Sequence, residues 1–161
     1  MKKIMDKLAS CIETIGGIAI LIMTLIVLLQ IVMRYFFNSP LTWSEEIARY
    51  IFIYITFLGA GILVYERGHL FVEVLFNKIQ GKSKNVLQFV LDLIVLIFSL
   101  YLLWSSRYSM QYAHGSRSTA VQIPMEYIGL SVMIGAALMI LFSLYHVVED
   151  IKKLTGKEEE L

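Results

Sequence analysis

Four long runs without a charged residue dominate this sequence, at positions 14–33, 50–65, 93–106 and 127–148. A helix that crosses a lipid bilayer needs about 20 mainly apolar residues, and each run reaches that length together with its weakly polar flanks. The chain is also 58% hydrophobic and only 17% charged, whereas a soluble domain is about 45–50% apolar and roughly a quarter charged. These features predict an all-α integral membrane protein with four transmembrane helices.

The expected helices belong to one membrane domain, residues 1–161, which ends in a charged tail at 149–161. Their approximate ranges are 12–35, 43–65, 86–106 and 124–148. Between the second and third helices, residues 70–79 mix apolar and charged side chains over a length too short to span. This pattern predicts a short amphipathic helix in the membrane interface. The alternative is a continuation of the second helix beyond the membrane.

Short motifs indicate where two of the helices begin. Thr42 and Glu45 have the spacing of a capping box, in which a hydroxyl and a carboxylate satisfy free backbone N–H groups. This spacing predicts that Thr42 caps the second helix. Pro124 suits the first turn of the fourth helix, where its missing N–H costs nothing.

Basic residues are distributed unequally between alternate sides of the membrane. The amino terminus, the second connector and the tail carry ten, namely Lys2, Lys3, Lys7, Arg67, Lys78, Lys82, Lys84, Lys152, Lys153 and Lys157. The other side carries four, namely Arg34, Arg49, Arg107 and Arg117. Because Lys and Arg concentrate in cytoplasmic loops, both termini and the amphipathic segment are expected in the cytoplasm. The first apolar run is longer than the signal-peptide core of about 7–15 residues, so it is expected to remain as the first helix.

Composition and motifs exclude several classes of protein. The net charge of +1 gives no reason to expect a nucleic-acid partner, and the single Cys11 excludes an intrachain disulfide and dithiol chemistry. No nucleophile–base pair or phosphate-binding glycine loop is present, so an enzyme with catalytic residues is not expected. His69, His114 and His146 form no facing pair that could hold haem, and no spacing of ligand residues indicates a metal. No cofactor is therefore expected.

Two polar features inside or beside the apolar runs invite a functional interpretation. Asp92 lies within the third helix, and ionisable residues inside a membrane are functional candidates by default. It can serve ion transport, or form a structural hydrogen bond within the bundle or to a partner. Trp43, Glu45, Glu46 and Arg49 form the densest polar cluster, because both glutamates have helical spacing to the arginine. That cluster can be a helix cap with a local ion pair, or a docking point for a partner protein.

The order of several short motifs resembles one known family. Arg34 is followed by Asn38-x-Pro40-x-x-Trp43-x-Glu45-Glu46, Phe57-Leu58-Gly59, Arg67-x-His69 and Ser118-x-Ala120-x-Gln122-Ile123-Pro124. This order, with the four-helix layout and the chain length, resembles the small membrane subunit (DctQ or SiaQ type) of tripartite ATP-independent periplasmic (TRAP) transporters. The resemblance covers nearly the whole chain.

The resemblance implies a sodium-coupled secondary transporter in the bacterial inner membrane. In that family a periplasmic binding protein delivers an organic anion, such as a dicarboxylate or sialic acid, to a large membrane subunit. The small subunit binds the large one and serves as its scaffold among the membrane lipids. Because the charged tail ends at Leu161, the separate rather than the fused form of the subunit is expected. The candidate interface or docking residues are Arg34, Trp43, Glu45, Glu46, Arg49, His69 and Asp92.

Two alternatives from other classes remain open on the sequence. An independent four-helix multidrug exchanger would carry an essential membrane acid in its first helix, where this chain has only Glu13 at the cytoplasmic edge. A haem- or quinone-linked subunit of a membrane enzyme would be recognised by the colour of the purified protein.

Overall fold

The computed structural model describes residues 2–67 and 82–154 of the chain, with side chains described for 2–67 and 86–152. Its helices are α1 (Lys2–Phe36), α2 (Thr42–Tyr65), α4 (Lys82–Ala113) and α5 (Glu126–Leu154). All four are long and apolar enough to cross a membrane, so the expected all-α fold with four membrane helices is confirmed. The expected interfacial helix at 70–79 lies outside the described residues, as does the end of the charged tail.

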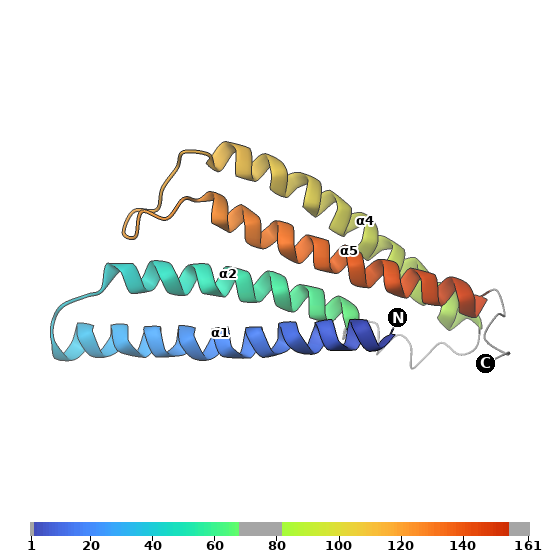
Figure 1. Cartoon of the computed structure of the whole chain (residues 1–161), viewed down its shortest axis with the longest axis horizontal. Coiled ribbons are helices and arrows are strands. Elements are labelled where there is room, and N and C mark those ends of the chain that lie inside the picture. Colours follow the sequence, from blue (N-terminus) through green and yellow to red (C-terminus); the bar gives the residue numbers. More distant parts are fainter. Residues whose placement is uncertain (1, 68–81, 155–161) are drawn as a thin grey trace.

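The four helices lie side by side in the order α1, α2, α5, α4 (Figure 1). The start of α1 and the end of α5 are at the same end of the bundle, together with the end of α2 and the start of α4 (Figure 1). The loops that follow α1 and α4 are at the opposite end. Such an arrangement places both ends of the described chain on one side of a membrane, as four crossings require.

The helices extend further than the sequence predicts. α1 begins at Lys2 rather than near residue 12, α4 continues to Ala113, and α5 continues to Leu154 into the expected tail. Charged residues mark where an apolar run stops, but a helix keeps its backbone hydrogen bonds when it leaves the hydrocarbon and enters water. Pro124 precedes α5 rather than forming its first turn, and its carbonyl accepts the N–H of Tyr127 at 3.2 Å.

The expected capping box at the start of α2 is wrong. Thr42 is the first helical residue, and Leu41 occupies the N-cap position without a side-chain hydrogen bond. The Ser44 hydroxyl instead donates to the carbonyl of Leu41 at 2.7 Å. Sequence spacing alone did not fix which residue would leave the helical conformation.

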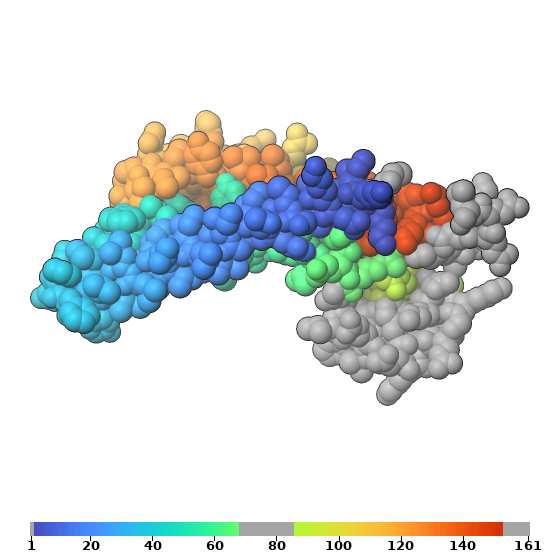
Figure 2. Space-filling model, turned by 60° about the horizontal axis from the view of Figure 1, so that its bottom comes forward, coloured from blue at the N-terminus to red at the C-terminus, as the bar shows by residue number. Residues whose placement is uncertain are grey.

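α5 is the central helix of the bundle. In its most apolar stretch 39% of residues are buried, whereas none is buried in that of α1. Figure 2 shows α1 along the outside of the molecule. The contact between α2 and α5 is close at Gly135, where an added Cβ would lie 2.6 Å from the Phe57 Cβ and 2.8 Å from its carbonyl oxygen. A small residue is therefore required at this crossing.

Three buried serines in the bundle are satisfied within their own helices. The hydroxyls of Ser99, Ser106 and Ser131 donate to carbonyls three or four residues earlier, at 2.7, 2.8 and 2.6 Å. A hydroxyl satisfied in this way can be buried in an apolar environment at little cost. The middle of the bundle therefore needs no polar contact between helices at these positions, and the ionic contacts lie at its two ends.

Candidate functional site

Arg67 is the centre of a polar cluster at the end of the bundle where α2 stops. The helix ends at Tyr65, and the N–H of Arg67 still donates to the carbonyl of Val64 at 3.2 Å. Arg67 then adopts a positive φ of 53°, which is uncommon for a residue other than glycine. This turn of the backbone directs its side chain toward α4 and α5.

The guanidinium of Arg67 joins three helices. Its Nη2 lies 3.0 Å from Oδ2 of Asp92 on α4 and 2.8 Å from Oδ1 of Asp150 on α5. With its amide oxygen turned toward the arginine, Gln88 on α4 accepts from Nη1 at 3.1 Å and from Nε at 3.2 Å. Asp92 and Asp150 are 5% and 4% exposed, so these are buried ion pairs. Removal of the arginine would leave two buried carboxylates without a cation.

His146 on α5 is held in one neutral form by this cluster. Its Nδ1 accepts from Nε of Arg67 at 3.2 Å, and its Nε2 lies 2.8 Å from the carbonyl oxygen of Tyr65. Arginine can only donate and a carbonyl can only accept. The ring therefore carries its hydrogen on Nε2 and is uncharged, which suits a side chain that is 6% exposed.

Two further contacts connect the cluster to its surroundings. The hydroxyl of Tyr65 donates to Oδ1 of Asp6, which ties the start of α1 to the end of α2. The hydroxyl of Ser143 donates to the backbone carbonyl of Asp92 at 2.9 Å, which ties α5 to α4. All four described helices are thus connected at this end of the bundle.

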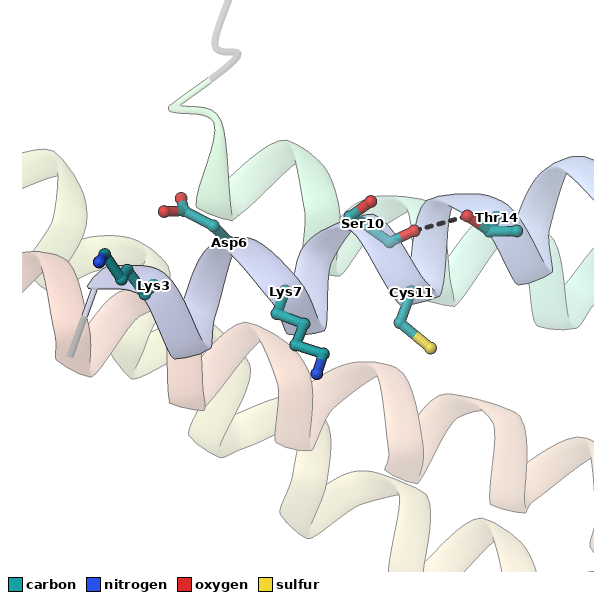
Figure 3. A pocket seen from close by; sticks show the side chains of 6 residues that line it. All are labelled: Lys3, Asp6, Lys7, Ser10, Cys11 and Thr14. Carbon is teal, nitrogen blue, oxygen red and sulfur yellow. Dashed lines mark hydrogen bonds between the residues drawn. The ribbon is translucent and has the colours of Figure 1, made fainter.

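An open hollow of about 540 Å³ lies beside the start of α1 and is lined by Lys3, Asp6, Lys7, Ser10, Cys11 and Thr14. Figure 3 shows Asp6 and Ser10 on one side of the helix and Lys7 and Cys11 on the other. The only hydrogen bond among the residues drawn joins the Thr14 hydroxyl to the Ser10 carbonyl at 2.8 Å. These side chains point to different sides of the helix and do not converge on a common point.

Glu46 forms a second polar cluster at the opposite end of the bundle. Its Oε2 accepts the backbone N–H groups of Ala120 and Val121 at 3.1 and 2.7 Å, and its Oε1 accepts from the Tyr50 hydroxyl at 3.4 Å. Hydrogen bonds to an ionised acceptor are about twice as strong as neutral ones. One carboxylate on α2 therefore fastens the loop between α4 and α5.

This loop, residues 114–125, folds back on itself. Ser118 and Ile123 exchange two hydrogen bonds, from the Ser118 N–H to the Ile123 carbonyl at 2.9 Å and from the Ile123 N–H to the Ser118 hydroxyl at 3.0 Å. Gln122 adopts a positive φ of 60° to close the turn. Three members of one sequence motif, Ser118, Gln122 and Ile123, thus build the turn that presents the backbone donors to Glu46.

The structure separates the two glutamates that the sequence analysis grouped with Arg49. Arg49 pairs with Glu45 at 3.2 Å, and both side chains are about two-thirds exposed, at 65% and 66%. Glu46 contacts the loop instead, as described above. Trp43 is 40% exposed beside them, and Arg34 is exposed in the last turn of α1. Trp43, Glu45 and Arg49 are therefore exposed, whereas Glu46 is bonded within the chain.

Sequence reasoning missed most of the Arg67 cluster. The sequence predicts Asp92 as a candidate, but it places Asp150 in the charged tail and indicates no role for His146 beyond the excluded haem ligand. Arg67 contributes only to the charge count and to one motif. The positions of His146 and Asp150, four apart on one face of α5, were the available signal. His69 lies outside the described residues. Within the described part of the chain, no group of three His, Cys, Asp or Glu residues could hold a metal ion.

Comparison with known proteins identifies similarity over most of the chain. Residues 23–153 match the family model described as tripartite ATP-independent periplasmic transporters, DctQ component. A putative TRAP transporter small permease protein of Haemophilus influenzae is 42% identical over 76 residues, which are 47% of this chain and 47% of that protein. This chain therefore spans about half of that relative's length.

Two other relatives extend the comparison. A second putative TRAP transporter small permease protein of Haemophilus influenzae is 24% identical over 96% of this chain and 94% of its own length. The sialic acid TRAP transporter permease protein SiaT of Haemophilus influenzae is 33% identical over 53% of this chain, but the match covers only 14% of SiaT. The region similar to this chain is thus a small part of a much longer polypeptide in SiaT.

Proposed function

The chain belongs to the DctQ-component family of the tripartite ATP-independent periplasmic transporters, and on that basis we propose that it is a small permease subunit that binds a large permease subunit stably and serves as its scaffold. The family match over residues 23–153 is the observation that carries this proposal. In SiaT, the region similar to this chain is covalently joined to a much larger remainder, which supports a stable association here between separate chains.

The scaffold role is supported by the way the polar side chains are used. Arg67 ties α2, α4 and α5 together at one end, and Glu46 fastens the α4–α5 loop to α2 at the other. Buried ion pairs at the Arg67 end and charge-assisted hydrogen bonds at the Glu46 end restrain the helices relative to each other. In this proposal Asp92 is structural, because it neutralises Arg67 rather than lining a path for an ion.

The surface available for the large subunit is apolar. Along α1, large hydrophobic side chains such as Leu21 and Leu25, each 66% exposed, face outward. Contacts of this kind suit either lipid or the helices of another membrane protein. The sodium and substrate sites belong to the large subunit in this proposal, and the substrate is an organic anion such as sialic acid or a dicarboxylate.

The loop end is the proposed docking surface for a periplasmic binding protein. Trp43, Glu45 and Arg49 are exposed there, next to the turn held by Glu46, and Arg34 lies in the last turn of the neighbouring helix. Exposed charges contribute more to the rate and orientation of protein encounter than to folding. Transient docking of the binding protein, rather than stable association, is therefore expected at this end.

This assignment requires the loop end to face the periplasm and both termini to be in the cytoplasm, in the inner membrane. Single cysteines at Ser39, Ser116 and Ser83, each placed in a Cys11→Ala background, test the orientation with an impermeant thiol reagent. Labelling at Ser39 and Ser116 but not at Ser83 is expected in cells with a permeabilised outer membrane. Labelling at Ser83 alone would show that the chain has the opposite orientation.

Reconstitution tests the role of the subunit. This chain alone, the large subunit alone and both together are placed in liposomes with the binding protein, a sodium gradient and candidate organic anions. Uptake is expected only when both membrane subunits are present, and the two should also purify as one complex. Sodium-driven uptake by this chain alone would refute the scaffold role, and full uptake by the large subunit alone would refute its necessity.

A further inference from the structure

Asp92 and Asp150 bring two carboxylates from different helices to one nitrogen of Arg67. Their oxygens lie 3.0 and 2.8 Å from the same Nη2, and both residues are at least nine-tenths buried. Because both oxygens contact the same nitrogen, the two carboxyl groups are close neighbours. Two ionised carboxylates have no hydrogen to share, so this arrangement lacks one donor.

Two buried carboxylate oxygens in the cluster lack a hydrogen-bond donor. Oδ2 of Asp92 and Oδ2 of Asp150 are inaccessible to solvent and have no hydrogen-bond partner in the described part of the chain. Nη2 of Arg67 lies 3.0 Å from Oδ2 of Asp92 but makes its hydrogen bond to Oδ1 of Asp150 instead. A buried acceptor without a donor is costly. A hydrogen placed between the two carboxyl groups would satisfy them.

The balance of charges in the cluster also favours one bound proton. One guanidinium faces two carboxylates, and His146 is held in its neutral form by the contacts described above. Glu149 on α5 adds a further negative charge that acts on Asp92. On α1, Asp6 bonds to Tyr65, and Lys2 lies at the rim of the adjacent cavity. With one bound proton, Arg67, Asp92, Asp150 and His146 together become electrically neutral, which lowers the cost of burying them.

We propose that Asp92 and Asp150 form a proton-binding site, in which the two carboxyl groups share one proton and this proton keeps the ends of α4 and α5 joined around Arg67. The proton belongs to the pair rather than to one residue. A cavity of about 270 Å³, lined in part by Arg67, His146 and Glu149, lies beside the cluster and gives the proton a route to solvent. Loss of the proton leaves a net negative charge between the helices and weakens their contact.

Infrared spectroscopy of the chain of residues 1–161 in detergent tests for the shared proton directly. A protonated carboxyl group has a C=O stretching band that a carboxylate lacks, and this band should be present near neutral pH. It should disappear in Asp92→Asn and in Asp150→Asn, because each variant keeps the shape of the pair but leaves a single carboxylate. Glu13→Gln, which alters an exposed acid of α1, is the control and should keep the band. Absence of the band in the wild-type subunit would overturn the proposal.

The pH dependence of unfolding tests its consequence for stability. In the unfolded chain both aspartates are ionised near neutral pH, so folding takes up one proton. As the pH rises, the folding equilibrium constant of the wild type should therefore fall more steeply than that of Asp150→Asn. The two slopes should differ by up to a factor of about ten per pH unit. Equal slopes would overturn the proposal. Stabilisation of the wild type by sodium ions in place of a pH dependence would overturn it in favour of a bound cation.

Discussion

Replacing Arg67 with methionine is expected to destabilise the subunit by about 3–5 kcal/mol, the usual cost of leaving a buried ion pair without one partner. Arg67 and its two aspartates count as buried ion pairs because their side chains are largely shielded from solvent. The Arg67 side chain is 22% exposed, and the carboxylates that it contacts are 7% and 5% exposed. An exposed pair would be worth only about 0–1 kcal/mol. Because whole proteins are stable by only about 5–15 kcal/mol, the loss should be easily measured.

Titration with a denaturing detergent in mixed micelles, followed by helical circular dichroism, measures the free energy of unfolding. Lys152→Met is the matched control, since it removes an exposed basic residue from the same end of the bundle, and surface changes usually stay within about 0.5 kcal/mol. The Arg67→Met change should cost much less in a chain that also carries Asp92→Asn and Asp150→Asn, because no buried carboxylate then lacks a cation. If Arg67→Met costs the same in both backgrounds, or costs less than about 1 kcal/mol in the chain that keeps both aspartates, the arginine does not stabilise the fold through these carboxylates.

Two other predictions concern the contact between α2 and α5 and the loop at the far end. Gly135→Val should lower stability by several kcal/mol or prevent folding, because its Cβ would collide with Phe57. Gly16→Ala, where nothing lies within 4 Å of an added Cβ, should leave stability unchanged or raise it by up to about 1 kcal/mol, because alanine favours a helix more than glycine does. Equal thermal stability of these two variants would contradict the close approach of the helices. Glu46→Ala should speed tryptic cleavage after Arg117 several-fold, because the loop loses the acceptor for two backbone N–H groups. An unchanged cleavage rate would mean that the loop holds its shape without the carboxylate.

The four helices could be predicted because each is encoded locally. A run of about 20 apolar residues has few alternatives to a membrane helix, since all its backbone groups must be satisfied within the segment. The ends of the helices were less well predicted, because hydropathy marks where the hydrocarbon stops and not where the backbone hydrogen bonds stop. For this reason the sequence does not predict that Asp150 belongs to the fourth helix, since the charged residues around it resemble a solvated tail.

The polar clusters depend on contacts that no local pattern contains. Arg67 reaches a carboxylate 83 positions later in the chain, and Glu46 reaches backbone groups 74 and 75 positions later. Glu45 and Glu46 have nearly the same spacing to Arg49, and only the orientation of α2 relative to the loop assigns them different partners. The sequence could therefore supply the candidate residues but not the pairs that they form.

The separation of Arg67 from Asp150 also has a consequence during biosynthesis. At translation rates of roughly 5–20 residues per second, the 83 positions between them correspond to a delay of roughly 4–17 s. Throughout that interval the arginine has already been made, but its partner on the last helix has not. An unpaired arginine side chain inside the hydrocarbon would be strongly disfavoured. At the end of α2, the guanidinium of Arg67 can remain hydrated beside the lipid headgroups. The position of the cluster at the end of the bundle thus allows α2 to be inserted long before α5 exists.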